Sequence, residues 1–365
     1  MLAFLKRLFG FVARPAAPAT TRSPRAAGPA RVRQPDRPRL DPRAVDSIAG
    51  ALPSPATLPN LDQPALNGDL LAMLDGREHF NATLSAKEEQ VLAAVSHRVD
   101  EGQLELPHLP QTTLSAMEMT SKNSSSVADV AELIAHDAVI TSELLRVANS
   151  ALYATHHPCT TLRDAVVRLG MRATRSMIMS VSMRTMLLRD KGLAAIATEV
   201  WRQSQSAAQI ARAIAPRLGF EPDRAFLIGL LHDIGKIALL ETVRREVRDR
   251  FEIRPCLIGR VFFLQHERAG ERIASAWKLP DELVSVAGCH HHYEKNAEHS
   301  RAAALARLVH TLDLVLSIGG LGEATRLESL PEFDALGIDP DDRPEILELV
   351  CETYLAGRAA GAPTA

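Results

Sequence analysis

The sequence has few of the residues that build disulfide scaffolds, aromatic cores or membrane spans. Its four cysteines stand singly along the 365 residues, so they offer neither a disulfide framework nor a CxxC zinc ribbon, and they predict reduced thiols in a cytoplasmic protein. Aromatic residues make up only 4% of the chain, so the core must be aliphatic, which favours helices over sheets. No stretch approaches the roughly 20 consecutive apolar residues of a spanning helix, which excludes a polytopic membrane protein.

The chain also lacks a large net charge, but its charges are unevenly distributed. Residues 1–60 contain 10 Lys or Arg against 3 Asp or Glu, whereas the remaining 305 residues contain 32 against 41. A basic arm on an acidic body argues against specific nucleic-acid binding by the whole protein. The basic arm alone could still bind an anionic surface.

The N-terminal arm has two parts. Residues 1–14 form an amphipathic segment in which Leu and Phe alternate with basic residues such as Lys6 and Arg7, a pattern typical of an interfacial membrane helix. It predicts peripheral contact with the inner face of the membrane, and the alternative is a segment without fixed structure. Residues 13–64 contain 11 of the 22 prolines, so we expect residues 15–64 to be a disordered, Pro/Arg-rich linker.

From about residue 65 the sequence predicts one helix after another and no strand. Ser85 and Glu88 form a capping box, and Thr161 marks another helix start. Gly170 is expected to end that second helix, and Pro216 and Gly219 to end a later one. We therefore predict an all-α fold with lead-in helices over 65–105, two helical subdomains over 106–190 and 191–320, and a C-terminal helix and tail over 321–365.

The second subdomain contains the residues best suited to bind a metal or to take part in catalysis. His232 and Asp233 close an apolar helical stretch, LIGLLHDIGK, and Lys236 follows them. Further candidates come later in the chain: His266, His290, His291 and Asp313. His and Asp side chains delivered from several helices are how a helical bundle holds a divalent metal, here Mn, Fe, Ni or Zn. Lys236 is the candidate catalytic residue, because it could hold a phosphate oxygen.

Each candidate also has a purely structural interpretation. Asp233 could cap its own turn, and His232 could be a core histidine with a satisfied hydrogen bond. The histidine triplet beginning at His290 could be solvated. Asp313 lies three residues after His310 on one helix face, so these two side chains could pair with each other. The coincidence of all these residues within about 110 positions is what favours a site.

Several separated motifs resemble the HDOD domain, a branch of the HD superfamily of helical metal-dependent phosphohydrolases. The similar segments span Leu106–Leu316 and follow in order: LPHLPQTTLSAMEM, VADVAELIAHDAVITSELLRVANSALY, LRDAVVRLG, LIGLLHDIGK, QHERAGERIASAWKLPDEL and CHHHY. One departure is Asp137-Ala138, where the family commonly has Asp-Pro. The resemblance implies a multi-helix bundle of HD type in two helical subdomains.

The resemblance also sorts the candidate ligands. His232, Asp233 and Asp313 match ligands of a mononuclear HD site, and Gln203 stands where catalytic relatives have a first histidine. His266, together with His290 or His291, matches the additional ligands of dinuclear HD-GYP relatives, but the GYP element itself is replaced by YEKNAEHS. Because a glutamine carbonyl is a feeble ligand for such metals, Gln203 weakens the implied catalysis, and the remaining His and Asp residues would still suffice for one ion.

Two functions follow as hypotheses. The first is a non-catalytic regulatory or scaffold module in bacterial signal transduction that binds a partner protein or a nucleotide, is cytoplasmic and can dimerise. The alternative is a metal-dependent phosphohydrolase or phosphodiesterase acting on a nucleotide or cyclic dinucleotide. The sequence identifies neither the signal nor the pathway.

Overall fold

A computed structural model describes residues 83–121, 125–150, 153, 157–188, 193–248, 251–318 and 327–361. Within these ranges every regular element is a helix, which confirms the predicted all-α fold. The predicted amphipathic segment 1–14 and the linker 15–64 lie outside the described residues. In the described part of the chain, no helix is both long and apolar enough to cross a membrane.

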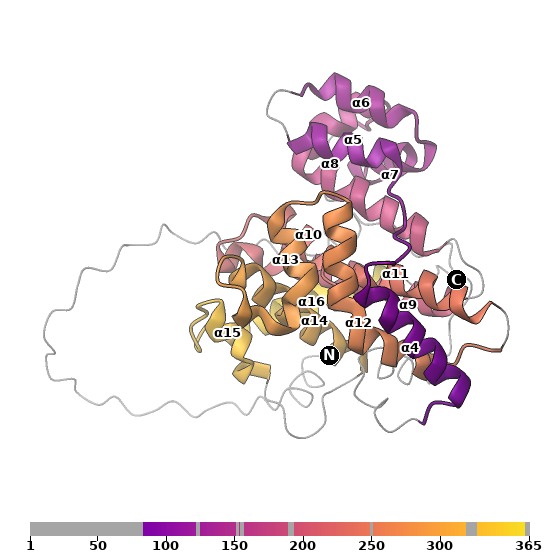
Figure 1. Cartoon of the computed structure of the whole chain (residues 1–365). Helices are drawn as coiled ribbons and strands as arrows, with labels where there is room; N and C mark the ends of the chain where they lie inside the picture. Colours follow the sequence, from indigo (N-terminus) through magenta and orange to yellow (C-terminus); the bar gives the residue numbers. More distant parts are fainter. Residues whose placement is uncertain are drawn as a thin grey trace, which may run out of the picture.

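The helices form two lobes (Figure 1). The first, which we call the upper lobe, contains α5 (Gln111–Ser121), α6 (Val127–Ala135), α7 (Ala138–Ala148) and α8 (Leu162–Leu187). The second, the HD lobe, contains α4 (Ala86–Asp100), α9 (Ala194–Leu218), α10 (Pro222–Leu231), α11 (Gly235–Val247), α12 (Pro255–Ala276), α13 (Asp281–Cys289), α14 (Ser300–Ile318), α15 (Pro331–Ala335) and α16 (Arg343–Gly361). Short 3₁₀ helices, η2 (His290–Lys295) and η3 (Leu327–Ser329), complete it.

Local signals set several helix boundaries, and one differs from the prediction. The capping box of Ser85 and Glu88 is present, and the Thr161 side chain accepts from the Asp164 backbone. Gly170 has a non-helical backbone (φ 79°, ψ 161°) and ends the first helical segment of α8; a second segment follows it directly after a kink. Gly219, in the left-handed conformation (φ 71°), ends α9 as predicted, whereas Pro216 lies inside the helix.

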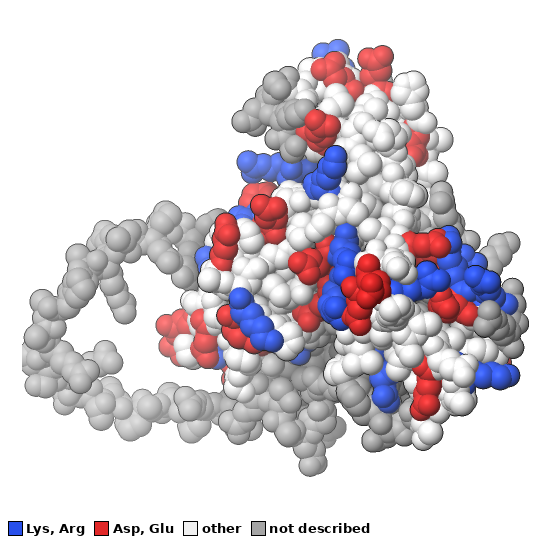
Figure 2. All heavy atoms as spheres, viewed as in Figure 1, with Lys and Arg blue, Asp and Glu red and all other residues white. Residues whose placement is uncertain are grey.

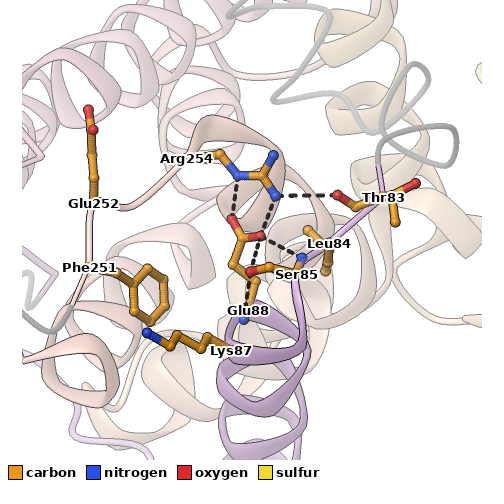
Figure 3. Close-up of a pocket in the computed structure, with 8 residues that line it drawn as sticks. All are labelled: Thr83, Leu84, Ser85, Lys87, Glu88, Phe251, Glu252 and Arg254. Carbon is orange, nitrogen blue, oxygen red and sulfur yellow. Dashed lines mark hydrogen bonds and ion pairs between the residues drawn. The ribbon is translucent and has the colours of Figure 1, made fainter.

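An ion pair at the N-terminus of helix α4 joins this helix to the rest of the HD lobe (Figure 3). Glu88 is only 1% exposed and accepts hydrogen bonds from the guanidinium of Arg254 and from the Ser85 backbone. The hydrogen bond from Arg254 is the main cause that lowers the pKa of Glu88 to about 2. The pair therefore joins α4 to the segment that leads into α12.

Glycines allow the helices of the HD lobe to approach closely. A Cβ at Gly235, the first residue of α11, would lie 2.0 Å from the carbonyl oxygen of His266 in α12. A Cβ at Gly270 would lie 2.5 Å from the carbonyl oxygen of Ala287 in α13. Since real Cβ atoms do not approach other atoms so closely, these positions require glycine. These contacts bring α11, α12 and α13 together around the candidate metal ligands predicted from the sequence.

Candidate metal centre

Six side chains from separate elements converge in the interior of the HD lobe. They are His232 and Asp233 between α10 and α11, His266 in α12, His290 and His291 at the start of η2, and His310 in α14. The first two and His290 are at most 2% exposed. Five of the six were predicted from the sequence as candidate metal ligands, and the structure brings these five together.

Asp233 lies at the centre of the cluster, and its Oδ2 atom faces three positive or polarisable groups. Lys236 Nζ donates to Oδ2 at 2.7 Å, and both side chains are buried. His232 Nε2 lies 3.1 Å from the same oxygen, and His310 Nδ1 lies 3.4 Å from it. Lys236, the predicted catalytic candidate, is therefore the counter-charge of Asp233.

The second oxygen of Asp233 faces the other side of the cluster. Oδ1 lies 3.6 Å from His290 Nε2 and 3.7 Å from His266 Nε2, and it has no hydrogen-bond partner. Burial by itself raises the pKa of Asp233, but the buried ammonium of Lys236 opposes this, and the pKa lies well below its usual range. Asp233 is therefore a carboxylate at neutral pH.

Backbone carbonyls orient three of the histidines in the same way. Nδ1 of each lies within hydrogen-bond distance of the carbonyl oxygen three or four residues earlier. These pairs are His232 with Gly229 at 2.8 Å, His266 with Phe262 at 2.7 Å and His290 with Val286 at 3.2 Å. Because a carbonyl only accepts, Nδ1 carries the proton and the lone pair of Nε2 is left for the cluster. This is the tautomer that a metal ligand requires.

Burial also keeps His266 and His290 neutral. It lowers the pKa of His266 to about 4 and that of His290 well below the usual value of an imidazole. Neutral imidazoles around one carboxylate are the forms in which these groups bind metal.

The residues present fit a divalent metal ion. Asp233 Oδ1 and Nε2 of His266, His290 and His291 are all buried without a hydrogen-bond partner. Leaving such atoms unpaired costs about 1–3 kcal/mol each, and a cation would satisfy several of them at once. Two overlapping groups have ligand atoms within 4.8 Å of one another: His232, Asp233, His290 and His310, and His266, His290 and His291. The mixed nitrogen and oxygen set suits Mn, Fe, Ni or Zn.

One residue of the sequence-based site lies outside both groups. Asp313 belongs to neither group and lies 3.5 Å from Arg202 Nη2. His310, which was not a candidate ligand, contacts His232 Nε2 at 3.1 Å. Sequence reasoning therefore missed His310, although its position one turn before Asp313 on the same helix face was a signal.

The space beside the cluster is very small. Gln203, His232, Lys236, His310 and Asp313 line it together with two apolar residues, and its volume is about 10 Å³. Gln203 thus does border the site, as the resemblance implied for the first-ligand position. A volume of this size holds about one water or ion.

The fold and the buried His/Asp cluster define a helical protein of HD type. The family model for the HDOD domain matches residues 106–293, and the chain belongs to this family. It is 22% identical over 220 residues to an uncharacterized protein of Treponema pallidum (strain Nichols), across 58% of this chain and 42% of that protein. It is also 32% identical over 102 residues to ribonuclease Y of Mycoplasmoides gallisepticum, across 28% of this chain and 16% of the relative. The chain thus spans less than half the length of these two curated relatives.

Solved structures share the fold. A proposed metal-dependent phosphohydrolase of Shewanella amazonensis SB2B has a TM-score of 0.59 at 24% identity, covering 76% of this chain and 100% of that one. An HDOD domain protein of unknown function from Geobacter sulfurreducens has a TM-score of 0.54 at 24% identity, covering 73% and 99%. A proposed signal transduction protein of Marinobacter aquaeolei VT8 has a TM-score of 0.52 at 22% identity, covering 84% and 68%.

Proposed function

We propose that this chain is an HDOD signalling module whose buried HD-type site binds one divalent transition metal and does not hydrolyse phosphate esters. The observation that carries the metal is a set of three buried ligand atoms without a hydrogen-bond partner: Asp233 Oδ1 and Nε2 of His266 and His290. His232, Asp233, His290 and His310 would hold the ion. Its charge would fix the helices α10 to α14 relative to one another, as structural metal sites do.

The size of the site argues against hydrolysis of a nucleotide. Pockets that hold drug-sized ligands have volumes of about 300–1,000 Å³. The space beside the cluster, of about 10 Å³, has no room for such a substrate. Lys236 is bound to Asp233, so its ammonium is not free for a phosphoryl group.

A signalling role is supported by the family and by the structural relative named as a signal transduction protein. The partner, a signalling protein or nucleotide, would contact the outer surface of the lobes and not the cluster. On the face shown in Figure 2, basic and acidic side chains are interspersed. Exposed ion pairs of the molecule include Arg244 with Glu241 and Arg245 with Glu105. Such paired charges favour a protein partner over a polyanion.

Metal content of the purified full chain tests the proposal. After incubation with Mn, Fe, Ni or Zn and removal of free metal, mass spectrometry should find about one ion per chain. Asp233→Ala and His310→Ala should lose it, and circular dichroism should show that His310→Ala is folded. Asp281→Ala, an exposed aspartate of the same lobe, is the matched control and should keep the metal.

The same samples decide between binding and catalysis. We expect the metal-loaded protein to hydrolyse p-nitrophenyl phosphate and bis-p-nitrophenyl phosphate no faster than Asp233→Ala. If the wild type retained no metal after this incubation, the proposed metal centre would be wrong. Hydrolysis that His310→Ala and Asp233→Ala abolish would instead establish the phosphohydrolase.

A further inference from the structure

His291 differs from the other histidines of the cluster in what its Nδ1 atom contacts. Arg307 of α14 places Nη1 2.7 Å from this nitrogen. A guanidinium has only N–H donors, so Nδ1 of His291 must accept the hydrogen bond. An accepting Nδ1 has no proton, so the ring is not the doubly protonated imidazolium and is neutral. A neutral ring that accepts at Nδ1 carries its proton on Nε2.

This tautomer is opposite to that of His232, His266 and His290. In those three rings Nδ1 faces a backbone carbonyl oxygen and Nε2 offers a lone pair. His291 instead directs an N–H towards the cluster, and its Nε2 is buried without a partner. A protonated ring nitrogen has no lone pair for a metal ion, but it can donate to an anion.

Two glutamates hold this arrangement in place. The backbone N–H of His291 donates to Glu267 Oε1 at 2.7 Å, which anchors His291 to α12. Arg307 Nε lies 3.7 Å from Glu332 Oε1 in α15, and Glu332 is only 5% exposed. Arg307 is therefore fixed on both sides, by His291 and by Glu332.

The charges of the cluster indicate which kind of group the Nε2–H of His291 would bind. Asp233 is the one carboxylate within the two groups of ligand atoms, and Lys236 already balances it. A divalent ion in this setting leaves an excess of positive charge, which a small anion would offset. The rings of His266, His290 and His310 lie 4.9, 4.3 and 5.2 Å from that of His291, centroid to centroid, so an anion among them can be no larger than about a water molecule.

We propose that His291 is not a metal ligand but a hydrogen-bond donor to a water-sized anion, such as hydroxide or fluoride, at the metal centre, with Arg307 as the positioning residue that sets its tautomer. The inference rests on the proposed metal centre. It assigns His291, a ligand candidate from the sequence, a different role from that of its neighbour His290.

Nitrogen NMR tests the tautomer directly. We would record long-range ¹H–¹⁵N spectra of the full chain with ¹⁵N-labelled histidine, before and after one equivalent of Zn²⁺. His291, assigned by its absence in His291→Gln, should keep its proton on Nε2 in both spectra, whereas His290 should lose its Nε2 lone-pair signal on binding zinc. A deprotonated, zinc-bound Nε2 at His291 would overturn the proposal.

Variants of Arg307 test whether this residue sets the tautomer of His291 or only supports the local packing. Arg307→Met should turn the single His291 tautomer into a mixture, and Arg307→Lys, which keeps an N–H donor, should restore it. An unchanged spectrum in Arg307→Met would overturn the role of Arg307.

Metal and anion affinity supply the second readout. His290→Ala should weaken Zn²⁺ binding at least tenfold, whereas His291→Ala should change it less than threefold. In the Co²⁺-loaded protein, followed by visible absorption, His291→Ala should weaken fluoride binding about tenfold, and the exposed neighbour variant His292→Ala should not. Equal metal loss in His290→Ala and His291→Ala, or unchanged fluoride affinity in His291→Ala, would overturn the inference while leaving the metal centre intact. A wild type without metal would overturn both.

Discussion

Replacing Lys236 with methionine removes the counter-charge of Asp233 while keeping most of the side-chain volume. The ion pair is 2.7 Å long, and its two side chains are 3% and 2% exposed, so no water replaces the lost ammonium. Breaking one side of a buried ion pair typically costs about 3–5 kcal/mol. In the metal-free protein we therefore expect Lys236→Met to lower the free energy of unfolding by about that amount.

Bound metal should remove most of this loss. A divalent ion beside Asp233 supplies the missing positive charge, which leaves only the cost of a similar-sized change in a packed interior, below about 1.5 kcal/mol. The wild type itself should gain about 2.7 kcal/mol when free metal is at 100 times its dissociation constant.

Urea unfolding of the full chain, with EDTA or with excess Zn²⁺, measures these differences. Trp201 and Trp277 are both buried in the HD lobe and report on its unfolding by fluorescence. Lys87→Met, an exposed lysine of α4, is the control and should have little effect in either condition. If Lys236→Met lost the same stability with and without zinc, the metal would not lie beside Asp233, and the reasoning would be wrong.

Three further predictions concern the lobe around the site. Gly235→Ala should destabilise the protein by about 1–3 kcal/mol and abolish metal uptake, because its Cβ would force α11 away from the His266 carbonyl, 2.0 Å distant; both effects are measurable on one preparation. Glu88→Gln should lower the urea midpoint at pH 7, and the gap to wild type should close as pH falls from 4.5 to about 2, where Glu88 itself becomes protonated. Asp313→Asn should change Zn²⁺ affinity less than threefold by calorimetry, because Asp313 pairs with Arg202 and belongs to neither group of ligand atoms.

Each of these has a control and a contradicting result. Gly288→Ala, whose Cβ would meet only the Glu271 side chain at 3.0 Å, should keep the metal, and equal damage in both glycine variants would refute the helix-contact argument. A gap for Glu88→Gln that is the same at pH 3 and pH 7 would show that the ion pair contributes no stability. If Asp313→Asn weakened Zn²⁺ binding as much as His290→Ala does, Asp313 would be a metal ligand and the prediction would be wrong.

The sequence alone determined the helical class and much of the site. The lack of aromatic residues and of alternating patterns predicted an all-α fold, and the capping box at Ser85 placed a helix start correctly, because such signals are local. The order of the motifs predicted the HDOD family. His232 and Asp233 were found because the dipeptide is itself a motif.

Only the tertiary structure decided which residues share the site and in what state. The sequence placed His310 and Asp313 together because one helix face carries both, yet His310 contacts Asp233 while Asp313 faces Arg202. The choice depends on how α14 packs against α9 and α10, which periodicity along one helix does not specify. Likewise, His290 and His291 are neighbours of one residue type, and only their contacts with Val286 and Arg307 give their rings opposite tautomers.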